Sequence, residues 1–309
     1  ETFALGINMP ARTVVFDELR KFYGRFFANL RTRDFYQMAG RAGRRGIDEE
    51  GFVYSRINPR FISIDEIKRV IFGQPEKVKS RFNLSYAAIL NLYQRYADKI
   101  YDIYPLSFHS FQEKERYRKR ALDLLHSKVD LLKELRFIDG ERLTDKGKFA
   151  SKIYGYELLM AELYSNGVFN NLTEIELGIL CLGLVFEPKK SSGKPILPKK
   201  ARGVSRITET MIGGIHDAER EFGIKHLSKD CFYHLSACLE AWMKGESFDK
   251  IMSLTDADEG GIIRYFRMCV QILREILETS VTHDLRAKTI HAIDLINRDI
   301  IDAEKQLRG

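Results

Sequence analysis

The sequence predicts a mostly α-helical protein in three parts: an incomplete α/β domain over residues 1–74, a winged-helix domain over 75–153 and an all-helical bundle over 154–309. Three observations lead to this fold class. Two β-branched and aromatic runs flank a helix near the start of the chain, helical periodicity dominates after residue 75, and a short hairpin pattern interrupts the helices near residue 140. With 309 residues, 44% of them hydrophobic, the chain can build more than one core.

The first part has the pattern of a strand, a helix and a second strand. The runs at 13–16 and 51–54 are rich in Val, Phe and Tyr, as strands are. Between them a helix is expected from Thr32, as the N-cap, to about Ala42. A capping box at Ser63 and Glu66 then begins a short helix that ends at Gly73.

The middle part combines helices with one tight hairpin. Ser85 is expected to cap a helix, and residues 113–135 carry leucine and valine at helical spacing. Residues 137–143 alternate in polarity around an Asp-Gly pair, which indicates a two-stranded hairpin, and a new helix follows from Thr144. Helices followed by a small wing and a further helix are typical of winged-helix modules, which bind nucleic acid or protein partners.

The last part is expected to be entirely helical. Asn- and Gly-rich turns separate seven apolar-periodic segments, at 156–165, 173–184, 205–220, 228–243, 247–253, 258–278 and 284–302. A stretch rich in Lys, Pro, Ser and Gly at 188–204 is predicted to be an exposed loop.

Composition excludes several classes of protein. The net charge of +7 and the pI near 9.1 are compatible with a polyanionic partner, and the basic residues concentrate in 1–60 and 188–206. No apolar run reaches the length of a membrane span, which predicts a soluble, cytoplasmic protein. Cys231, His234 and Cys238 share a helix face but have no evident fourth ligand, so we expect buried, reduced thiols and no metal site.

The most specific motif lies at residues 37–46, which read QMAGRAGRRG. Arg41 and Arg44 are three residues apart and each follows a glycine, so both can project from a helix end toward one anionic group. An arginine placed on a γ-phosphate stabilises the charge that develops during phosphoryl transfer. The alternative, a solvated basic helix end, does not require glycines at these positions.

This motif resembles motif VI of superfamily-2 helicases. Residues 1–15, which read ETFALGINMPARTVV, are similar to the motif V stretch of the superkiller-type DExH-box RNA helicases. The resemblance continues into the winged helix at 80–92, the wing and first bundle helices at 137–169, and the C-terminal helical domain at 242–264. It implies a RecA-like identity for the first part and a ratchet function for the helical bundle.

The resemblance assigns roles to individual residues. It makes Arg41 and Arg44 contacts of the ATP γ-phosphate, and it implies that Gln37 lies beside the nucleotide or couples the nucleotide to the RNA track. Gly6 and Asn8 are implied contacts of motif V with the nucleotide sugar. It further implies ATP and Mg²⁺ as cofactors of the complete protein and translocation from 3′ to 5′.

The chain is expected to be a fragment of a longer polypeptide, because it begins within motif V. It contains no Gly-x-x-x-x-Gly-Lys-Ser/Thr phosphate loop, so the fragment alone is expected to be inactive and to bind no cofactor. Residues 108–112 run directly into the helix at 113–135, where exosome-associated eukaryotic members insert a long arch. The chain therefore resembles an archless relative.

A second candidate site lies on the helix at 258–278. Arg264, Arg267, Gln271 and Arg274 form one polar stripe at offsets 0, 3, 7 and 10, opposite an apolar face. Such a stripe can follow a strand through phosphate contacts and stacking, and the resemblance places the ratchet helix here. The alternative is a solvated face in which Arg274 pairs with Glu278.

Together these features predict the C-terminal portion of an ATP-dependent RNA helicase. Its expected partners are single-stranded RNA, with DNA possible, and the RNA-degradation machinery. Two alternatives remain open at this level: a DNA-repair helicase of the related archaeal type, and a nonenzymatic scaffold that binds nucleic acid or protein.

Overall fold

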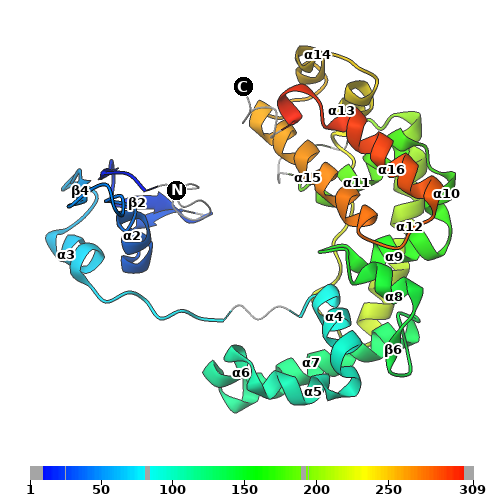
Figure 1. Cartoon of the computed structure of the whole chain (residues 1–309), viewed down its shortest axis with the longest axis horizontal. Coiled ribbons are helices and arrows are strands. Elements are labelled where there is room, and N and C mark those ends of the chain that lie inside the picture. Colours follow the sequence, from blue (N-terminus) through cyan, green and yellow to red (C-terminus); the bar gives the residue numbers. More distant parts are fainter. Residues whose placement is uncertain (1–9, 25, 81–83, 189–192, 194, 303–309) are drawn as a thin grey trace. The chain divides into compact units, whose positions relative to one another are not determined.

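The computed structural model describes residues 10–24, 26–80, 84–188, 193 and 195–302. It divides into unit 1, Glu1–Ser80, and unit 2, Arg81–Gly309, each with a hydrophobic core of its own (Figure 1). Helices dominate and strands are few, so the mostly α-helical fold class is confirmed. The further division into RecA-like, winged-helix and ratchet domains stays a prediction.

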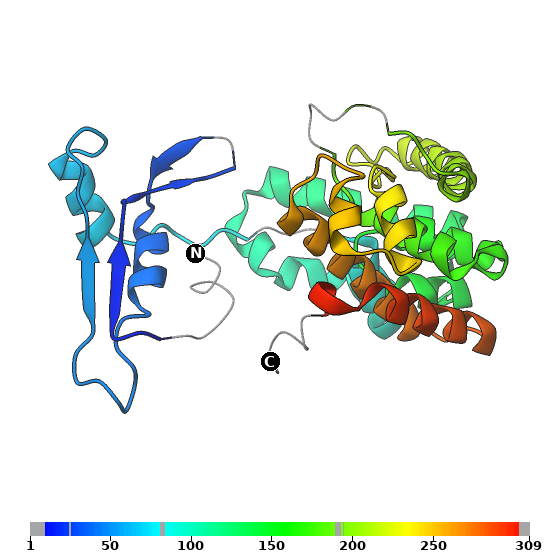
Figure 2. The ribbon, with the colours of Figure 1, turned by 90° about the horizontal axis from the view of Figure 1, so that it is seen from above.

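Unit 1 is built on a small parallel sheet. Strands β1 (Thr13–Phe16) and β4 (Phe52–Ser55) pair in parallel, with Thr13 opposite Phe52, and helix α2 (Thr32–Ala39) connects them and lies alongside (Figure 2). Phe16 of β1 stacks on Phe35 of α2 at 4.8 Å between ring centroids. The strand, helix and strand expected from the sequence are therefore confirmed.

Two further elements complete unit 1. Strands β2 (Arg20–Phe22) and β3 (Phe27–Asn29) form an antiparallel hairpin that the sequence analysis did not predict. Helix α3 (Ile64–Phe72) is capped by Ser63, whose side chain accepts the N–H of Glu66, and by Gly73, as predicted. The other half of the predicted capping box does not form, because the carboxylate of Glu66 accepts from Asn29 and Arg69 instead.

The predicted N-cap of α2 is wrong. Arg31 occupies the N-cap position, and Thr32 is the first helical residue, buried, with its hydroxyl donating to the carbonyl of Arg69 at 2.8 Å. The carboxylate of Glu76 instead accepts the N–H groups of Thr32 and Arg33, at 3.1 and 2.9 Å. A distant carboxylate thus satisfies the first amides of the helix and complements its dipole.

The first half of unit 2 holds short helices around one long one. Helices α4 (Tyr86–Tyr96), α5 (Ile100–Ile103), α6 (Phe108–Gln112) and α7 (Glu115–Glu134) come first. The hairpin of β5 (Ile138–Asp139) and β6 (Arg142–Leu143) and helix α8 (Asp145–Ala150) follow. Ser85 and Thr144 cap α4 and α8 as predicted, and the hairpin is confirmed.

The second half packs around α11 (Glu174–Val185), whose residues from Leu177 to Val185 are all buried. A helix that is apolar on all sides belongs in the middle of a bundle. Helices α12 (Lys199–Glu221), α13 (Ser236–Met243), α15 (Glu259–Leu277) and α16 (His283–Ile296) contact it, and α15 and α16 lie side by side (Figure 1). The remaining helices are α9 (Glu157–Ser165), α10 (Val168–Asn171) and α14 (Phe248–Met252).

The bundle departs from the expected pattern in four places. The last predicted helix, at 284–302, is divided: α16 ends at Ile296, and a separate 3₁₀ helix follows at Asp299–Ile301. The predicted basic loop is wrong for its second half, because α12 begins at Lys199 and buries Ala201 and Val204. The predicted helix at 228–243 begins only at Ser236, since the preceding segment bonds to other elements, with Phe232 N–H donating to the carbonyl of Gly183. The short helix α10 was not predicted.

A buried polar network joins the two halves of unit 2. Glu219 of α12 is fully buried and accepts the hydroxyl of Tyr86 at 2.7 Å. Glu157 of α9 accepts the N–H of Ala87 at 3.1 Å. Because buried carboxylates need hydrogen-bond partners, these contacts fix α4 against α9 and α12.

Candidate nucleotide and nucleic-acid sites

The glycine-arginine motif forms the loop between α2 and β4. Its backbone is bonded to the segment before β1: Ala11 N–H donates to the carbonyl of Arg41 at 2.9 Å, and Gly43 N–H donates to the carbonyl of Ala11 at 2.7 Å. Gly43 has a φ of +87°, a conformation that favours glycine. The loop is thus fixed to Ala11, which lies within the stretch of residues 1–15 that resembles motif V.

The close approach of two glycines shapes this loop. A Cβ atom on Gly51 would lie 2.5 Å from the carbonyl carbon of Ala42 and 2.6 Å from the nitrogen of Gly43. Since no side chain fits there, the start of β4 lies directly against the backbone that carries the arginines.

Arg44 is held by a carboxylate four residues further along the chain. Its Nε donates to Oδ2 of Asp48 at 2.8 Å and its Nη2 donates to Oδ1 at 3.0 Å, while the Arg44 backbone N–H also donates to Oδ2 at 3.0 Å. The side chain of Asp48 is only 7% exposed and that of Arg44 is 43% exposed. The hydrogen bonds from Arg44 lower the pKa of Asp48 to about 2, so the carboxylate is ionised at neutral pH.

The other residues of the predicted nucleotide site fall into two groups. Arg41 is half-buried in the same loop, and Gln37 is exposed on α2, so the structure brings Gln37, Arg41 and Arg44 to one end of α2. Gly6 and Asn8 lie outside the described residues. Sequence analysis missed Asp48, although its spacing of four from Arg44 is the spacing at which charges pair on a helical turn.

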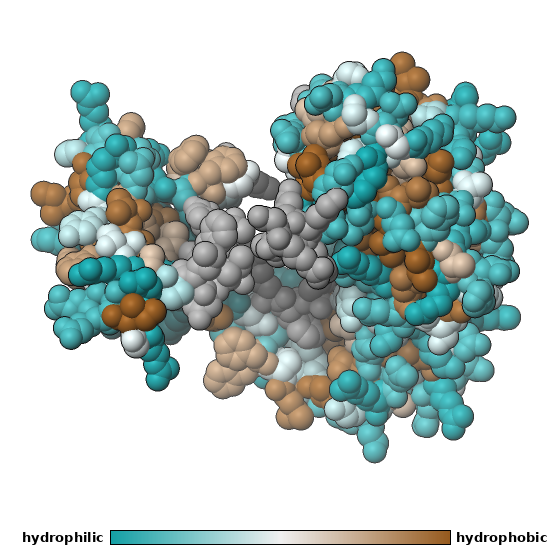
Figure 3. Space-filling view, turned by 45° about the horizontal axis from the view of Figure 1, so that its top comes forward, coloured by the Kyte–Doolittle hydropathy of each residue, from teal (hydrophilic) through white to brown (hydrophobic). Residues whose placement is uncertain are grey.

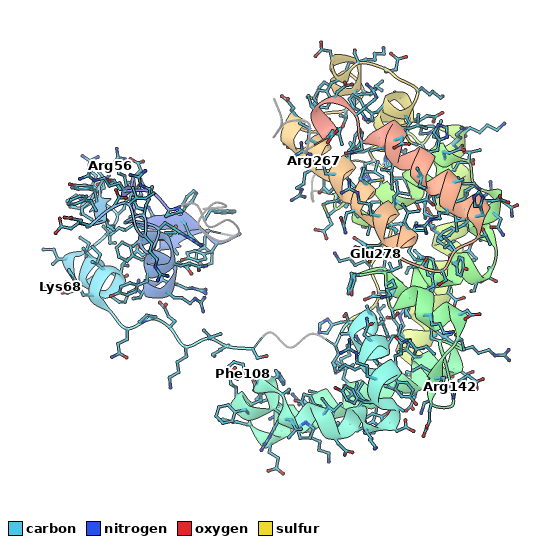
Figure 4. All side chains as sticks on the ribbon, viewed as in Figure 1. Arg56, Lys68, Phe108, Arg142, Arg267 and Glu278 are labelled. Atoms are coloured by element: carbon cyan, nitrogen blue, oxygen red, sulfur yellow. The ribbon has the colours of Figure 1, made fainter. Side chains whose placement is uncertain are left out.

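The polar stripe on α15 divides into two kinds of residue. Arg264, Gln271 and Arg274 are exposed, and Arg264 and Gln271 border a shallow hollow of about 380 Å³. Arg267 is half-buried and donates from Nε and Nη2 to the carbonyls of Ile301 and Ile300, both at 2.9 Å (Figure 4). Arg267 therefore ties α15 to the segment after α16 in addition to bordering the hollow.

The opposite face of α15 anchors it in the bundle. On the apolar face that the spacing predicts, Phe266 and Val270 are buried, and Ile263 and Leu277 are partly buried. Glu275 is also buried, and its Oε2 accepts the N–H of Tyr154 at 3.1 Å, while burial raises the pKa of its carboxyl. In the described residues Arg274 forms no ion pair with Glu278, so the pairing considered as the alternative is not present.

The cysteines do not assemble a metal site in the part of the chain that the structure describes. Cys238 is buried and burial raises the pKa of its thiol to about 11, while Cys231 is partly buried with a thiol pKa raised to about 12 for the same reason. Within the same residues no helix is both long and apolar enough to cross a membrane.

The comparison with protein families identifies the class. Residues 140–304, just over half of the chain, match the DSHCT (NUC185) domain, and the chain belongs to this family. The match includes the hairpin turn at Gly140 and all of α15.

The relatives are superkiller-type helicases. The chain is 40% identical over 136 residues to human "Superkiller complex protein 2", which is 43% of this chain and 11% of that protein. It is 43% identical over 108 residues to "Antiviral helicase SKI2" of Saccharomyces cerevisiae, 35% of this chain and 8% of the relative. It is 42% identical over 114 residues to human "Exosome RNA helicase MTR4", 36% of this chain and 11% of the relative. The resemblance to the C-terminal region of superkiller-type helicases is confirmed, and the matches span about a tenth of each relative.

Proposed function

We propose that this chain is the C-terminal portion of an ATP-dependent RNA helicase that moves from 3′ to 5′ along single-stranded RNA. Support comes from the family match, from the helicase names of the relatives and from the backbone bonds between Ala11 and the loop of Arg41 and Gly43. The last observation carries the proposal, because it joins the two segments that resemble motifs V and VI.

In the complete protein ATP and Mg²⁺ would bind between two RecA-like domains. Arg44 would supply positive charge to the γ-phosphate oxygens as charge spreads over them in the transition state. Asp48 occupies Nε and Nη2 of Arg44, which leaves Nη1 directed away from the carboxylate for a phosphate oxygen. Arg41, in the same loop, would contact the same group, and Gln37 would lie beside the nucleotide.

The RNA strand would follow the exposed residues of α15. Arg264 and Arg274 would contact phosphates, and Gln271 would supply hydrogen bonds between them, a pattern that tolerates any base sequence. Because relatives carry the names of a superkiller complex protein and an exosome helicase, we also propose RNA-degradation machinery as the partner and the cytoplasm as the location.

The arginine role is tested by Arg44→Ala in the complete helicase. Turnover should fall by about 10³ or more, while affinity for single-stranded RNA stays nearly unchanged, because the lost charge acts on the transition state. The control is Arg45→Ala, an exposed neighbour without a described partner, which should keep nearly full turnover. Equal turnover of both variants would remove the assignment.

A further inference from the structure

A strongly basic and aromatic surface lies where α6 meets α7. We call it the α6–α7 corner, and it consists of Phe108, Phe111, Lys114, Arg116, Tyr117, Arg118, Lys119 and Arg120. Figure 4 shows Phe108 at the end of α6, and in Figure 3 hydrophobic side chains gather at the edge of unit 2 where Figure 1 places this helix. Every residue of the corner is exposed.

The charges of the corner are unbalanced. Residues 106–120 contain five cations and two acids, Glu113 and Glu115. None of the five cations forms an ion pair within the described residues. Lys114 and Arg116 also lie at the N-terminus of α7, where the helix dipole disfavours positive charge. Cations in this position lower the stability of the helix, so they contribute nothing to folding, and this favours a role in binding a polyanion.

The aromatic side chains of the corner are exposed to solvent. Phe111 is 83% exposed, Phe108 54% and Tyr117 48%. The guanidinium groups of Arg116 and Arg120 both lie 5.9 Å from the ring centroid of Tyr117. Planar rings interleaved with arginines are the combination that stacks bases and neutralises phosphates in proteins that bind single strands.

A cavity of about 790 Å³ adjoins the corner at Arg120. Lys128 of α7 also lines it, together with Lys225 and His226 from the connection between α12 and α13. None of its described lining residues is acidic. Lys128 is buried, with Nζ donating to the carbonyl of Leu84 at 2.5 Å, and burial lowers the pKa of its amino group. Arg120 therefore belongs to the corner and also lines this cavity.

We propose that the α6–α7 corner is a second binding site for single-stranded RNA, separate from α15. Phosphates contact Arg116, Arg118, Lys119 and Arg120, and bases stack on Phe111 and Tyr117. The positive charge of the corner favours RNA as its ligand. A protein partner would have to be strongly acidic, whereas every RNA strand carries regularly spaced phosphates for the cations and planar bases for the aromatic rings. This site goes beyond the proposed function, which assigns RNA contact to α15.

The test measures binding of fluorescent oligouridine by the full chain at several salt concentrations. The corner variant carries Arg116→Gln, Arg118→Gln, Lys119→Gln and Arg120→Gln, and glutamine retains high helix propensity. We expect an affinity about 10-fold or more lower at 0.1 M salt and a salt slope smaller by roughly 2 to 3 units, since each phosphate contact on a single strand contributes about 0.7.

A matched control removes the same number of charges elsewhere. Its changes, all at exposed cations paired with acids, are Lys148→Gln, Arg220→Gln, Lys229→Gln and Lys244→Gln. This control should keep most of the slope. If both variants lose slope equally, net charge alone explains binding and the corner site is overturned.

Two further variants test the stacking contacts. Phe111→Ala with Tyr117→Ala should lower affinity about 5-fold or more with an unchanged salt slope, and Phe111→Trp with Tyr117→Trp should retain binding. Unchanged RNA binding by the corner variants would overturn the inference and leave an acidic protein as the occupant. The outcome for the corner can be told apart from the outcome for the proposed function. If an α15 variant loses RNA binding and the corner variants do not, the proposed function stands and the corner site is refuted.

Discussion

At the scale of single residues, the pair of Arg44 and Asp48 is the most informative feature. Two hydrogen bonds from the guanidinium of Arg44 and a third from its backbone N–H all go to the carboxylate of Asp48, and the first two orient the guanidinium. A long, freely rotating arginine would lose rotamer freedom when it engaged a phosphate, and Asp48 removes that cost in advance. We therefore assign Asp48 as a positioning residue for Arg44.

The positioning role predicts a specific effect of Asp48→Asn in the complete helicase. Turnover should fall about 10- to 100-fold, because a small misplacement of a catalytic group has effects of that size. In the background of Arg44→Ala the same change should cause no further loss, since no guanidinium remains to be positioned. Steady-state ATP hydrolysis measures both, and an additive loss in the double variant would contradict the role.

At the scale of elements, α15 is a rigid support with two kinds of arginine. Arg267 and buried Glu275 tie it to the segment at Ile300 and Ile301 and to the backbone of Tyr154. Arg264 and Arg274 remain open on its surface. The tethering role and the proposed RNA-contact role are therefore separable by mutation.

Two variants of α15 should separate these roles. Arg264→Gln with Arg274→Gln should reduce the salt slope of RNA binding by roughly 1 to 1.5 units, at about 0.7 per lost contact, with little change in stability. Arg267→Gln should lower the free energy of unfolding by about 1.5–3 kcal/mol, through its lost charge-assisted hydrogen bonds. Salt-dependent binding and denaturant unfolding measure the two effects. A normal slope in the first variant would mean that the open arginines only solvate the helix.

At the scale of the whole molecule, the chain contains two cores of very different size. Unit 1 buries Phe16, Leu19, Leu30, Phe35, Ile62 and Val70, whereas the core of unit 2 extends through nearly all its helices. Because the stability of a domain grows with the apolar surface that it buries, unit 1 should be much the weaker of the two.

Thermal unfolding should therefore show two transitions, the lower from unit 1. Trypsin should cleave at the exposed Lys77 or Lys79, near the C-terminal end of unit 1, and the upper transition should persist unchanged after cleavage. Circular dichroism at 222 nm, a standard helix wavelength, monitors it because unit 2 holds most of the helices. Lys77→Gln with Lys79→Gln and Arg81→Gln, which removes every tryptic site from residues 77–81, is the control for cleavage at this segment. Loss of the upper transition on cleavage would show that unit 2 depends on unit 1.

Local sequence patterns predicted the elements whose signals are local. The hairpin at Gly140 and the caps at Ser85 and Thr144 depend on residues within a few positions of one another, and they were found. The cap of α2 was missed because Glu76 reaches it from 44 residues away. The start of α12 at Lys199 was missed because the residues there have the composition of a loop. Only their burial against other helices makes this segment helical.

The candidate sites show the same limit. The motif placed Arg41 and Arg44 together on one loop, but the bonds of Arg267 depend on where residues 300 and 301 lie, and no spacing along α15 reveals that. The cations of α7 were visible in the sequence as five in seven positions. The sequence alone did not identify them as part of a binding surface, because that inference depends on the exposure of the surrounding aromatic side chains in the structure.

Because Gly43 and Gly51 are in close contact, the effect of an inserted residue depends on where in this loop it is added. Residues 44–50 could lengthen without disturbing the strands, because neither end of that stretch sets the pairing of β1 with β4. One residue added between Gly51 and Phe52 would shift the contact out of register with the strand and displace the loop backbone. For anyone who transplants this loop into another scaffold, the unit to move is therefore the loop together with its strand, since the arginine loop alone lacks the surface against which it is shaped.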